Sequence, residues 1–442
     1  MFLAAGLLTV GMLNCQPAES PQVVRSPVAQ KWLDRAQASF RTVDLDDAQD
    51  AASEALRAVP DDPEIRLIAA NLALARLDFA DTVRLTEGLE HPQALAIRGR
   101  ALWYAGDVKK AGAVLEALLR DPEVKDPWAK AISKLANLGA GRTPYRIDGS
   151  IVAAVEMPHL RGASLIVPVE IDGEQGLAMI ATATAEVVLD SAQRKEPAWV
   201  SVRIGERVEF HDVPAVTQDL SGLSRQLGAP VKALLGVNFL RHANPTFDFE
   251  ARQFVVRRFA PPRPPAATDV PLHYIRGGGM IMRGAFAADA SAPRAPMMID
   301  TSSMFPLTLD NDGWHKAGVN PATLTPMAED PSIKQGTVPL LRIGQFDLPQ
   351  VAGVLGKDMS NLETSLGLDI DGVVGAGLLA GFRVTLGDGG RLMWVEEDVV
   401  SLNAPAENPD AEESTPAPPG SSGSAPATMP PAAAPSAAPL HR

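Results

Sequence analysis

The sequence has one cysteine, Cys15, so it can form no intrachain disulfide and no thiol cluster for a metal. Its seven histidines are scattered, with neither an HExxH motif nor another paired-ligand spacing, so we expect no metal site and no cofactor. The formal net charge of −13 argues against a general nucleic-acid-binding surface. The triplet Gly277-Gly278-Gly279 lacks the Lys-Ser/Thr pair of a phosphate loop and is interpreted as a flexible turn or bulge.

The apolar run Phe2–Leu13 has 12 residues, too few to span a bilayer as a mature helix and about right for the central part of an export signal. It leads into Met12–Cys15, which resembles a bacterial lipoprotein signal, in which the cysteine is lipidated and becomes the mature N-terminus. By that resemblance, Gln16 favours the outer membrane. We expect a cell-envelope protein anchored through Cys15 and facing the periplasm, with plain secretion or a cytosolic protein carrying a chance apolar leader as the alternatives.

Between Val28 and about Leu138, apolar residues recur at three- and four-residue steps, which is a helical period. Pro60, Pro92 and Pro122 stand 32 and 30 residues apart and are interpreted as the ends of successive units, a pattern typical of stacked helical hairpins. The segment Gly99–Ala111 resembles a tetratricopeptide repeat. The repeats could offer a peptide groove or act as a spacer or packing partner for the next domain, and so short an array favours the second interpretation.

Two features refine the helical prediction. Gly106-Asp107 would make the turn between the helices of the best repeat, and Ala111 would allow its helices to pack closely. Asp126-Pro127-Trp128 predicts an N-cap and a first-turn proline for a final capping helix.

After Gly141 the pattern changes to short alternating strands. Leu165 to Ile171 alternates, Asp172-Gly173 offers a two-residue hairpin turn, and Leu177 to Ile180 forms the returning strand. Further strands are predicted at Trp199 to Ile204, Val208 to Val213 and Phe254 to Arg257. This pattern predicts an all-β region.

The β region contains an internal repeat. Leu234-Leu235-Gly236 corresponds to Val373-Val374-Gly375, ten residues later each copy has a threonine, and sixteen residues later each has an arginine that opens the last strand. The members of these pairs are Thr246 and Thr385, then Arg252 and Arg391. The equal spacing predicts two homologous lobes.

Each lobe also has an apolar pair that runs into a short polar loop, at Met298–Ser303 and at Met179–Thr184. With the later apolar pair and glycine, this layout resembles the retropepsin- and pepsin-like aspartic proteases. In that family each lobe supplies one aspartate, and the two carboxylates share a proton and activate the water that attacks a peptide bond. A pair is needed because neighbouring like charges cannot both ionise, so one acts as the acid and the other as the base.

The resemblance assigns the residues of the two loops. It makes Asp300 the candidate catalytic aspartate, with Thr301 and Ser302 in the Thr-Gly positions, and it makes Gly236 and Gly375 the glycines that support the loops. In the first loop the corresponding residues are Ala181, Thr182 and Ala183. The family's threonines interlock the two loops, so Thr182 and Thr301 are expected to dock the lobes even without catalysis.

Ala181 has no proton to exchange, and neither Asp172 nor Asp190 is an obvious substitute. A lone Asp300 lacks its partner, and groups that act as a unit lose their effect when one is removed. Asp300 of two chains could pair in a homodimer, as in retroviral enzymes, although the first lobe already occupies that docking surface.

We therefore predict a multidomain α plus all-β protein: tetratricopeptide-like helical repeats, then a two-lobed aspartic-protease-like β domain and a disordered tail rich in Pro, Ala and Ser. It would be a catalytically impaired protein that binds extended peptide or a protein partner between the lobes. The alternatives are an active endopeptidase, through homodimerisation or an unrecognised second acid, and a repeat scaffold with a remnant β domain. The expected segments are the leader 1–15, tether 16–27, repeats 28–140, first lobe 150–260, second lobe 268–398 and tail 403–442.

Overall fold

A computed structural model describes residues 25–158, 165–289, 291–356, 363–364 and 366–397. The predicted leader with Cys15 and the predicted tail at 403–442 lie outside these residues. The described chain begins with helices and continues as a β-rich region. The predicted order, a helical region followed by a β region, is therefore confirmed. In the described ranges, no helix has both the length and the apolar character needed to cross a membrane.

The helical region consists of consecutive antiparallel pairs and a final single helix. Pro63, Pro92 and Pro127 occupy the first turns of α3, α5 and α7, where a proline costs no hydrogen bond. Pro92 therefore begins a unit, whereas the sequence pattern had placed it at the end of one. The helices are α1 (Pro27–Arg41), α2 (Leu45–Ala58), α3 (Pro63–Ala75), α4 (Phe79–Thr86), α5 (Pro92–Tyr104), α6 (Val108–Leu119) and α7 (Pro127–Leu138).

The turn of the best repeat has the expected chemistry. Gly106 has a φ of +82°, which suits glycine, and the Asp107 side chain accepts a hydrogen bond from the backbone of Lys110 as the N-cap of α6. Ala111 is fully buried. Asp126 caps α7 in the same way, by accepting from the backbone of Ala129.

The first lobe is built on a seven-stranded sheet of order β1-β7-β5-β8-β4-β3-β6. Its strands are β1 (Arg146–Gly149), β3 (Ile166–Ile171), β4 (Glu174–Ala181), β5 (Val187–Asp190), β6 (Ala198–Ile204), β7 (Val208–Gln218) and β8 (Val231–Gly236). Helices α8 (Ser221–Leu227) and α9 (Val237–Ala243) flank β8.

The second lobe is built on an eight-stranded sheet of order β12-β13-β14-β19-β15-β18-β17-β16. Its strands are β12 (His273–Tyr274), β13 (Met280–Ala285), β14 (Arg294–Asp300), β15 (Leu307–Leu309), β16 (Thr325–Pro326), β17 (Lys334–Ile343), β18 (Phe346–Leu355) and β19 (Gly372–Gly375). Its helices are α10 (Asn311–Lys316), α12 (Ala376–Leu379) and the 3-10 turns η1 (Ile275–Gly277), η2 (Pro321–Thr323) and η3 (Asp388–Gly390).

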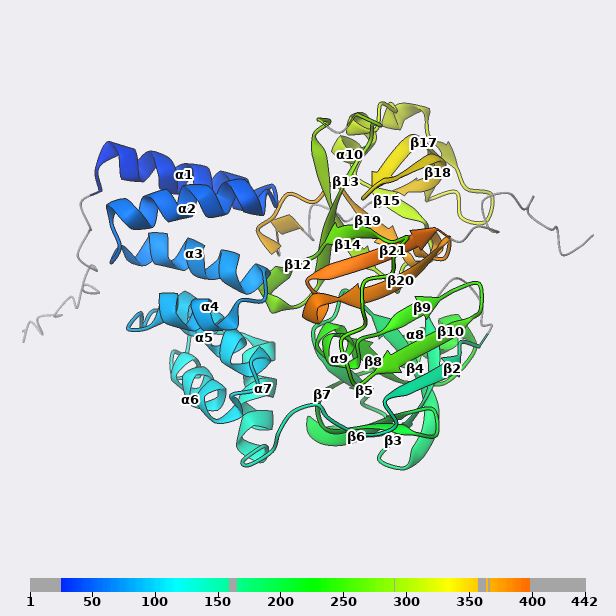
Figure 1. Cartoon of the computed structure of the whole chain (residues 1–442), viewed down its shortest axis with the longest axis horizontal. Coiled ribbons are helices and arrows are strands. Elements are labelled where there is room, and N and C mark those ends of the chain that lie inside the picture. The colour runs from blue at the N-terminus through cyan, green and yellow to red at the C-terminus, as the bar shows by residue number, and fades with distance from the viewer. Residues whose placement is uncertain (1–24, 159–164, 290, 357–362, 365, 398–442) are drawn as a thin grey trace, which may run out of the picture. The chain divides into compact units, whose positions relative to one another are not determined.

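A third sheet, of six strands, joins the lobes in the order β11-β21-β20-β9-β10-β2. Figure 1 shows β20 and β21 in orange beside β9 and β10 in green. At its centre Thr246 of β9 is paired with Thr385 of β20, and their hydroxyl oxygens are 2.8 Å apart. The strands are β2 (Val152–Glu156), β9 (Thr246–Asp248), β10 (Gln253–Arg257), β11 (Thr268–Pro271), β20 (Phe382–Gly387) and β21 (Leu392–Glu397).

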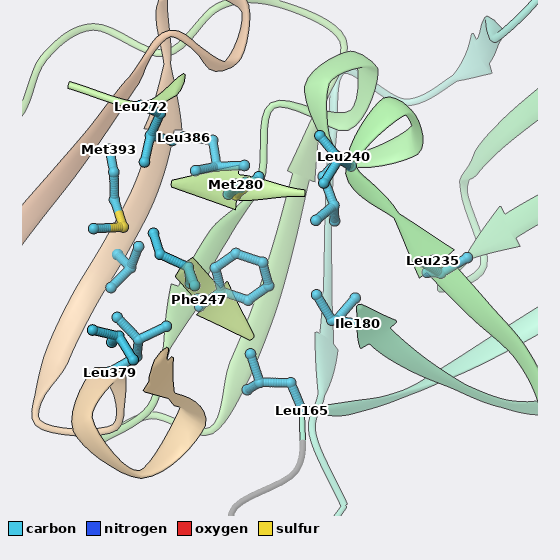
Figure 2. Close-up of a cluster of buried hydrophobic side chains, with 14 of the residues drawn as sticks. Leu165, Ile180, Leu235, Leu240, Phe247, Leu272, Met280, Leu379, Leu386 and Met393 are labelled. Carbon is cyan, nitrogen blue, oxygen red and sulfur yellow. The ribbon is translucent and has the colours of Figure 1, made fainter. Parts of the chain in front are cut away.

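The apolar core is continuous between the lobes. In Figure 2, Ile180 and Leu235 of the first lobe belong to the same buried cluster as Met280 and Leu379 of the second. Phe247 of the joining sheet lies among them and is 4% exposed. Because apolar burial is the main favourable term in folding, this shared core fixes the two lobes together.

The helical repeats pack on the β region. Helices α3 and α5 both contact η1. A Cβ atom on Gly277 would lie 2.4 Å from the Tyr104 ring and 3.5 Å from Leu74, so the glycine triplet begins in a tight contact. At the end of the array, the Trp199 indole donates a 2.8 Å hydrogen bond to the carbonyl of Leu135. These contacts make the repeats a packing partner of the β region.

Candidate active-site loops

Ala181 and Asp300 occupy the same place in their lobes. Each ends a strand that runs parallel to a second strand, and the register pairs Ala181 with Gly236 and Asp300 with Gly375. The strands place these residues at the sheet end because the residues before them are buried. Met179 and Ile180 pack into the core in the first lobe, as do Met298 and Ile299 in the second.

Close backbone contacts leave no room for a side chain at either supporting glycine. A Cβ on Gly236 would lie 2.2 Å from the carbonyl oxygen of Glu186 and 2.7 Å from that of Thr184. A Cβ on Gly375 would lie 2.0 Å from the carbonyl oxygen of Phe305 and 2.7 Å from that of Ser303. In both lobes, the backbone after the loop therefore packs directly against the supporting glycine.

The two loops are joined by reciprocal hydrogen bonds. The Thr182 hydroxyl donates to the carbonyl of Ile299 at 2.8 Å, and the Thr301 hydroxyl donates to the carbonyl of Ile180 at 2.7 Å. Each hydroxyl oxygen also accepts from the other threonine's backbone N–H, at 3.2 and 3.1 Å. Thr182 and Thr301 are 4% and 1% exposed, so water does not compete for these bonds.

Asp300 is the carboxylate at this junction. It is half-buried, and its Oδ1 accepts from the backbone N–H of Ser302 at 2.9 Å and from the Ser302 hydroxyl at 2.6 Å. Ala181 is 3% exposed and supplies only a methyl group. Beyond them, Ala183 and Ser302 are exposed at matching positions of the two loops, and Met304 is 39% exposed. At equivalent positions of the junction, the second lobe therefore has a carboxyl group and the first has a methyl group.

The two other first-lobe aspartates considered from the sequence are engaged elsewhere. Asp172, at the hairpin turn, accepts from the backbone of Ser201 at 2.8 Å and pairs with Arg194 at 2.9 Å. Asp190 ends β5, and its Oδ1 accepts from two backbone N–H groups at 3.2 Å. Both are local structural contacts.

Glu186 is a site residue that sequence reasoning missed. It follows the first loop and is 3% exposed, and its Oε1 accepts a 3.1 Å hydrogen bond from the indole of Trp128 in α7. Burial raises the pKa of this carboxyl group, and the hydrogen bond from Trp128 partly offsets that effect. Its one sequence signal is a charged residue directly before the apolar run Val187–Leu189.

Glu186 belongs to a polar cluster between the repeats and the first lobe. Arg241 of α9 donates to Asn238 Oδ1 at 2.9 Å, and its guanidinium lies 5.0 Å from the centre of the Phe79 ring. Burial lowers the pKa of Arg241. Four buried atoms here have no hydrogen-bond partner among the described residues: Glu186 Oε2, Asn238 Nδ2, Arg241 Nε and the Tyr145 hydroxyl. Unpaired buried groups are costly and normally have a specific cause.

Other features of the described residues are separate from Asp300. A cavity of about 560 Å³ lies where α2 to α4 approach the second lobe, with Arg76, His273 and Arg283 in its lining. Within the described ranges, His, Cys, Asp and Glu side chains form no group of three or more that could hold a metal ion. The predicted catalytic and loop-supporting residues, by contrast, all meet at the junction of the lobes.

Comparison with known proteins gives weak similarities only. No family model and no curated protein matches the chain. A retropepsin-like aspartic protease from Rickettsia conorii matches with 17% identity and a TM-score of 0.22, covering 29% of this chain and 90% of its own. An aspartic proteinase from Irpex lacteus matches with 9% identity and a TM-score of 0.37, covering 57% and 99%. The first TPR of Spaghetti (RPAP3), bound to an HSP90 peptide, matches with 18% identity and a TM-score of 0.24, covering 26% and 98%.

Proposed function

We propose that this protein is an aspartic-protease-like pseudoenzyme that binds extended peptide or a protein partner at the junction of its lobes without efficient cleavage. The observation that carries the proposal is the pair of interlocked loops with Asp300 in one and Ala181 at the same position of the other. A single carboxylate cannot be both the base that takes a proton from water and the acid that protonates the leaving group.

Intact loop geometry supports binding as the retained role. The threonine bonds and both glycine contacts are present although the first loop has no acid. Ala183 and Ser302 are exposed in the two loops, and their small side chains would leave room for an extended chain. Met304, directly after the second loop, is exposed as well. A bound peptide would therefore contact backbone and small side chains of both loops.

The geometry argues against the homodimeric enzyme. Thr301 already bonds to Thr182 and to the Ile180 carbonyl within one chain. Pairing Asp300 with Asp300 of a second chain would require breaking these buried bonds and opening the shared core.

Cleavage of a peptide library at acidic and neutral pH by the wild type and Asp300→Asn tests the catalytic part. We expect no turnover that depends on Asp300. Cleavage by the wild type that Asp300→Asn abolishes would overturn the proposal and establish an enzyme with an unrecognised second acid. Ala181→Asp should restore the missing carboxylate in register, with Ala183→Asp as its control at an exposed position of the same loop.

Selection of binders from the same library tests the other part. Ser302→Trp fills the exposed side of the second loop, whereas Ser332→Trp places the same side chain at an exposed position outside it. We expect Ser302→Trp alone to lose peptide binding. Equal binding by both variants, or no selected peptide at all, contradicts the proposed site.

We further propose that the protein is an exported lipoprotein of the bacterial cell envelope, on the strength of the Phe2–Leu13 run and the cysteine that follows it. Labelling with a radioactive fatty acid should mark the wild type and not Cys15→Ala. Release of the unlabelled wild type into the medium would indicate plain secretion instead.

A further inference from the structure

A second candidate site lies between the repeats and the first lobe, away from Asp300. It is a cavity of about 250 Å³. Its lining comes from the turn between α5 and α6, from the segment that leads into the first lobe, and from α9 and β7. The lining residues are Trp103, Tyr104, Ala105, Gly106, Arg142, Thr143, Pro144, Tyr145, Pro214, Asn238 and His242.

Four of the eleven lining residues carry aromatic rings, and each of these rings packs against another ring. Trp103 meets Trp199 edge to face, with centroids 5.9 Å apart, and Tyr104 packs against Trp128 at 6.0 Å. Tyr145 stacks on His242 at 4.4 Å with the ring planes 13° apart. Rings fixed in this way present a preformed surface, so a ligand would not have to order them.

The cavity has little net charge. Burial lowers the pKa of His242 to about 4, so its imidazole is neutral near pH 7. The Arg142 guanidinium pairs with Asp212 at 2.5 Å and lies 5.7 Å from the centre of the Trp199 ring. Because its one charged lining residue is already paired, the cavity offers a strongly charged ligand no new counter-ion.

Two lining residues have unused hydrogen-bonding capacity. Asn238 is 3% exposed and Tyr145 is 8% exposed, and the amide nitrogen and the phenol oxygen respectively have no partner among the described residues. Both atoms are closed off from solvent, so a side-chain rotation would have to bring each of them to a hydrogen-bond acceptor in the cavity, which would then supply the missing partner. Water is the competing occupant, since buried polar sites commonly hold it.

We propose that this cavity binds a neutral aromatic ring that carries an amide carbonyl, as in an aromatic amino-acid derivative or an aromatic residue of a peptide. A cavity of roughly 150 Å³ lined by apolar side chains is known to hold benzene, so 250 Å³ has room for a ring the size of indole. The ring would stack between Trp103 and Tyr145, and its carbonyl would face Asn238.

Asn238, which lines the cavity, also contacts the segment that follows the first loop. The backbone N–H of Asn238 donates to the carbonyl of Ala185 at 3.0 Å, and that of Val237 donates to Thr184 at 2.8 Å. A ligand against Asn238 therefore contacts the residue that holds the loop beyond Ala181. A ligand could occupy this cavity even if the junction at Asp300 binds no peptide.

Titration of the full-length protein with N-acetyl-tryptophanamide, followed by calorimetry and by saturation-transfer NMR, tests the proposal. We expect saturable binding of this probe and none of N-acetyl-alaninamide, which has the amide without the ring. A tryptophan-containing hexapeptide forms a second arm: tighter binding of the hexapeptide assigns the site to peptides, and weaker binding assigns it to the free derivative.

Thr143→Trp fills the cavity from an exposed lining position, and Thr325→Trp adds the same side chain at an exposed position elsewhere. Thr143→Trp should weaken probe binding by about tenfold or more, while Thr325→Trp should not change it. Asn238→Leu, which keeps the size and removes the amide, should weaken binding of the probe more than binding of free indole. Absence of saturable binding to the wild type, or unchanged affinity in Thr143→Trp, overturns the proposal and leaves a water-filled cavity.

Discussion

Trp128 on the last repeat helix donates a hydrogen bond of 3.1 Å to the buried carboxylate of Glu186, five residues beyond Ala181. The bond joins the helical repeats to the loop that has no aspartate. Arg100 lies 4.1 Å over the Trp128 ring and so supports the indole through its face. The repeats thus help to hold the first loop in place, and the consequences are measurable.

Glu186 should make stability depend on pH. Because burial raises its pKa, the folded protein holds this proton more tightly than the unfolded chain does. Its contribution is therefore fully present below the unfolded pKa of about 4.5 and is lost as the pH rises through the higher folded pKa. Gln has no proton to lose at this position. Above the folded pKa of Glu186, the Glu186→Gln variant should therefore be more stable than the wild type, by on the order of 1 kcal/mol.

Urea unfolding of both proteins between about pH 4 and pH 8 measures this difference. Glu196→Gln is the control, since Glu196 is exposed and pairs with Lys134. A stability difference between wild type and Glu186→Gln that stays constant over the range would contradict the raised pKa.

Trp128→Phe tests the hydrogen bond itself. It keeps a ring against Arg100 and removes the indole N–H, which leaves Glu186 Oε1 without its donor. Loss of a partner by a buried hydrogen-bonding group costs about 1 to 3 kcal/mol. Trp32→Phe is a matched control, because Arg35 also lies over that ring, at 5.5 Å, and it should cost less. Equal costs would show that the indole bond adds nothing.

The two threonines should be strongly coupled. Thr182→Val and Thr301→Val preserve shape and each leaves buried backbone groups unpaired, at a cost of about 1 to 3 kcal/mol. Because the two hydroxyl oxygens are 3.3 Å apart and share partners, the double variant should cost clearly less than the sum. A double-mutant cycle by denaturant unfolding measures the coupling, with Thr325→Val as an exposed control. Additive costs would mean that the loops are held independently.

The supporting glycines should tolerate no side chain. Gly236→Ala and Gly375→Ala each place a carbon within 2.2 Å of a carbonyl oxygen, so the loop must move. We expect losses above about 3 kcal/mol for each, measured as a shift of the unfolding midpoint. Gly222→Ala in α8 has open space around its new carbon and should be neutral or stabilising by up to about 1 kcal/mol. Similar effects at all three positions would argue against the close backbone path.

The sequence was sufficient to predict those residues whose pattern is repeated along the chain or lies within a few positions. The spacing of Gly236 to Thr246 recurs at Gly375 to Thr385, and the two threonines that it singled out are paired in the joining sheet. Asp126 was predictable as a cap, and Gly106-Asp107 as a turn, because each signal lies within a few residues. Repeated and local patterns are visible without a structure.

The contacts of Glu186 had no comparable signal. Trp128 is 58 residues away and lies in another class of structure, so no period or spacing relates the two. Tyr104 and Gly277 are even farther apart in the sequence. Their packing is the reason that a glycine triplet interpreted as a flexible turn begins in a tight contact. Pro92 was assigned to the wrong end of a unit because proline is compatible with both the first turn of a helix and the residues after its end.

The pairing of Thr246 with Thr385 has a consequence for synthesis, because the two residues are 139 positions apart. When the first lobe leaves the ribosome, β9 has β10 on one side and nothing on the other until β20 has been made. Open strand edges invite pairing with other chains, so during this interval the nascent protein is exposed to aggregation. A fragment that ends after β10 would keep that edge permanently, which makes the two lobes one unit of assembly.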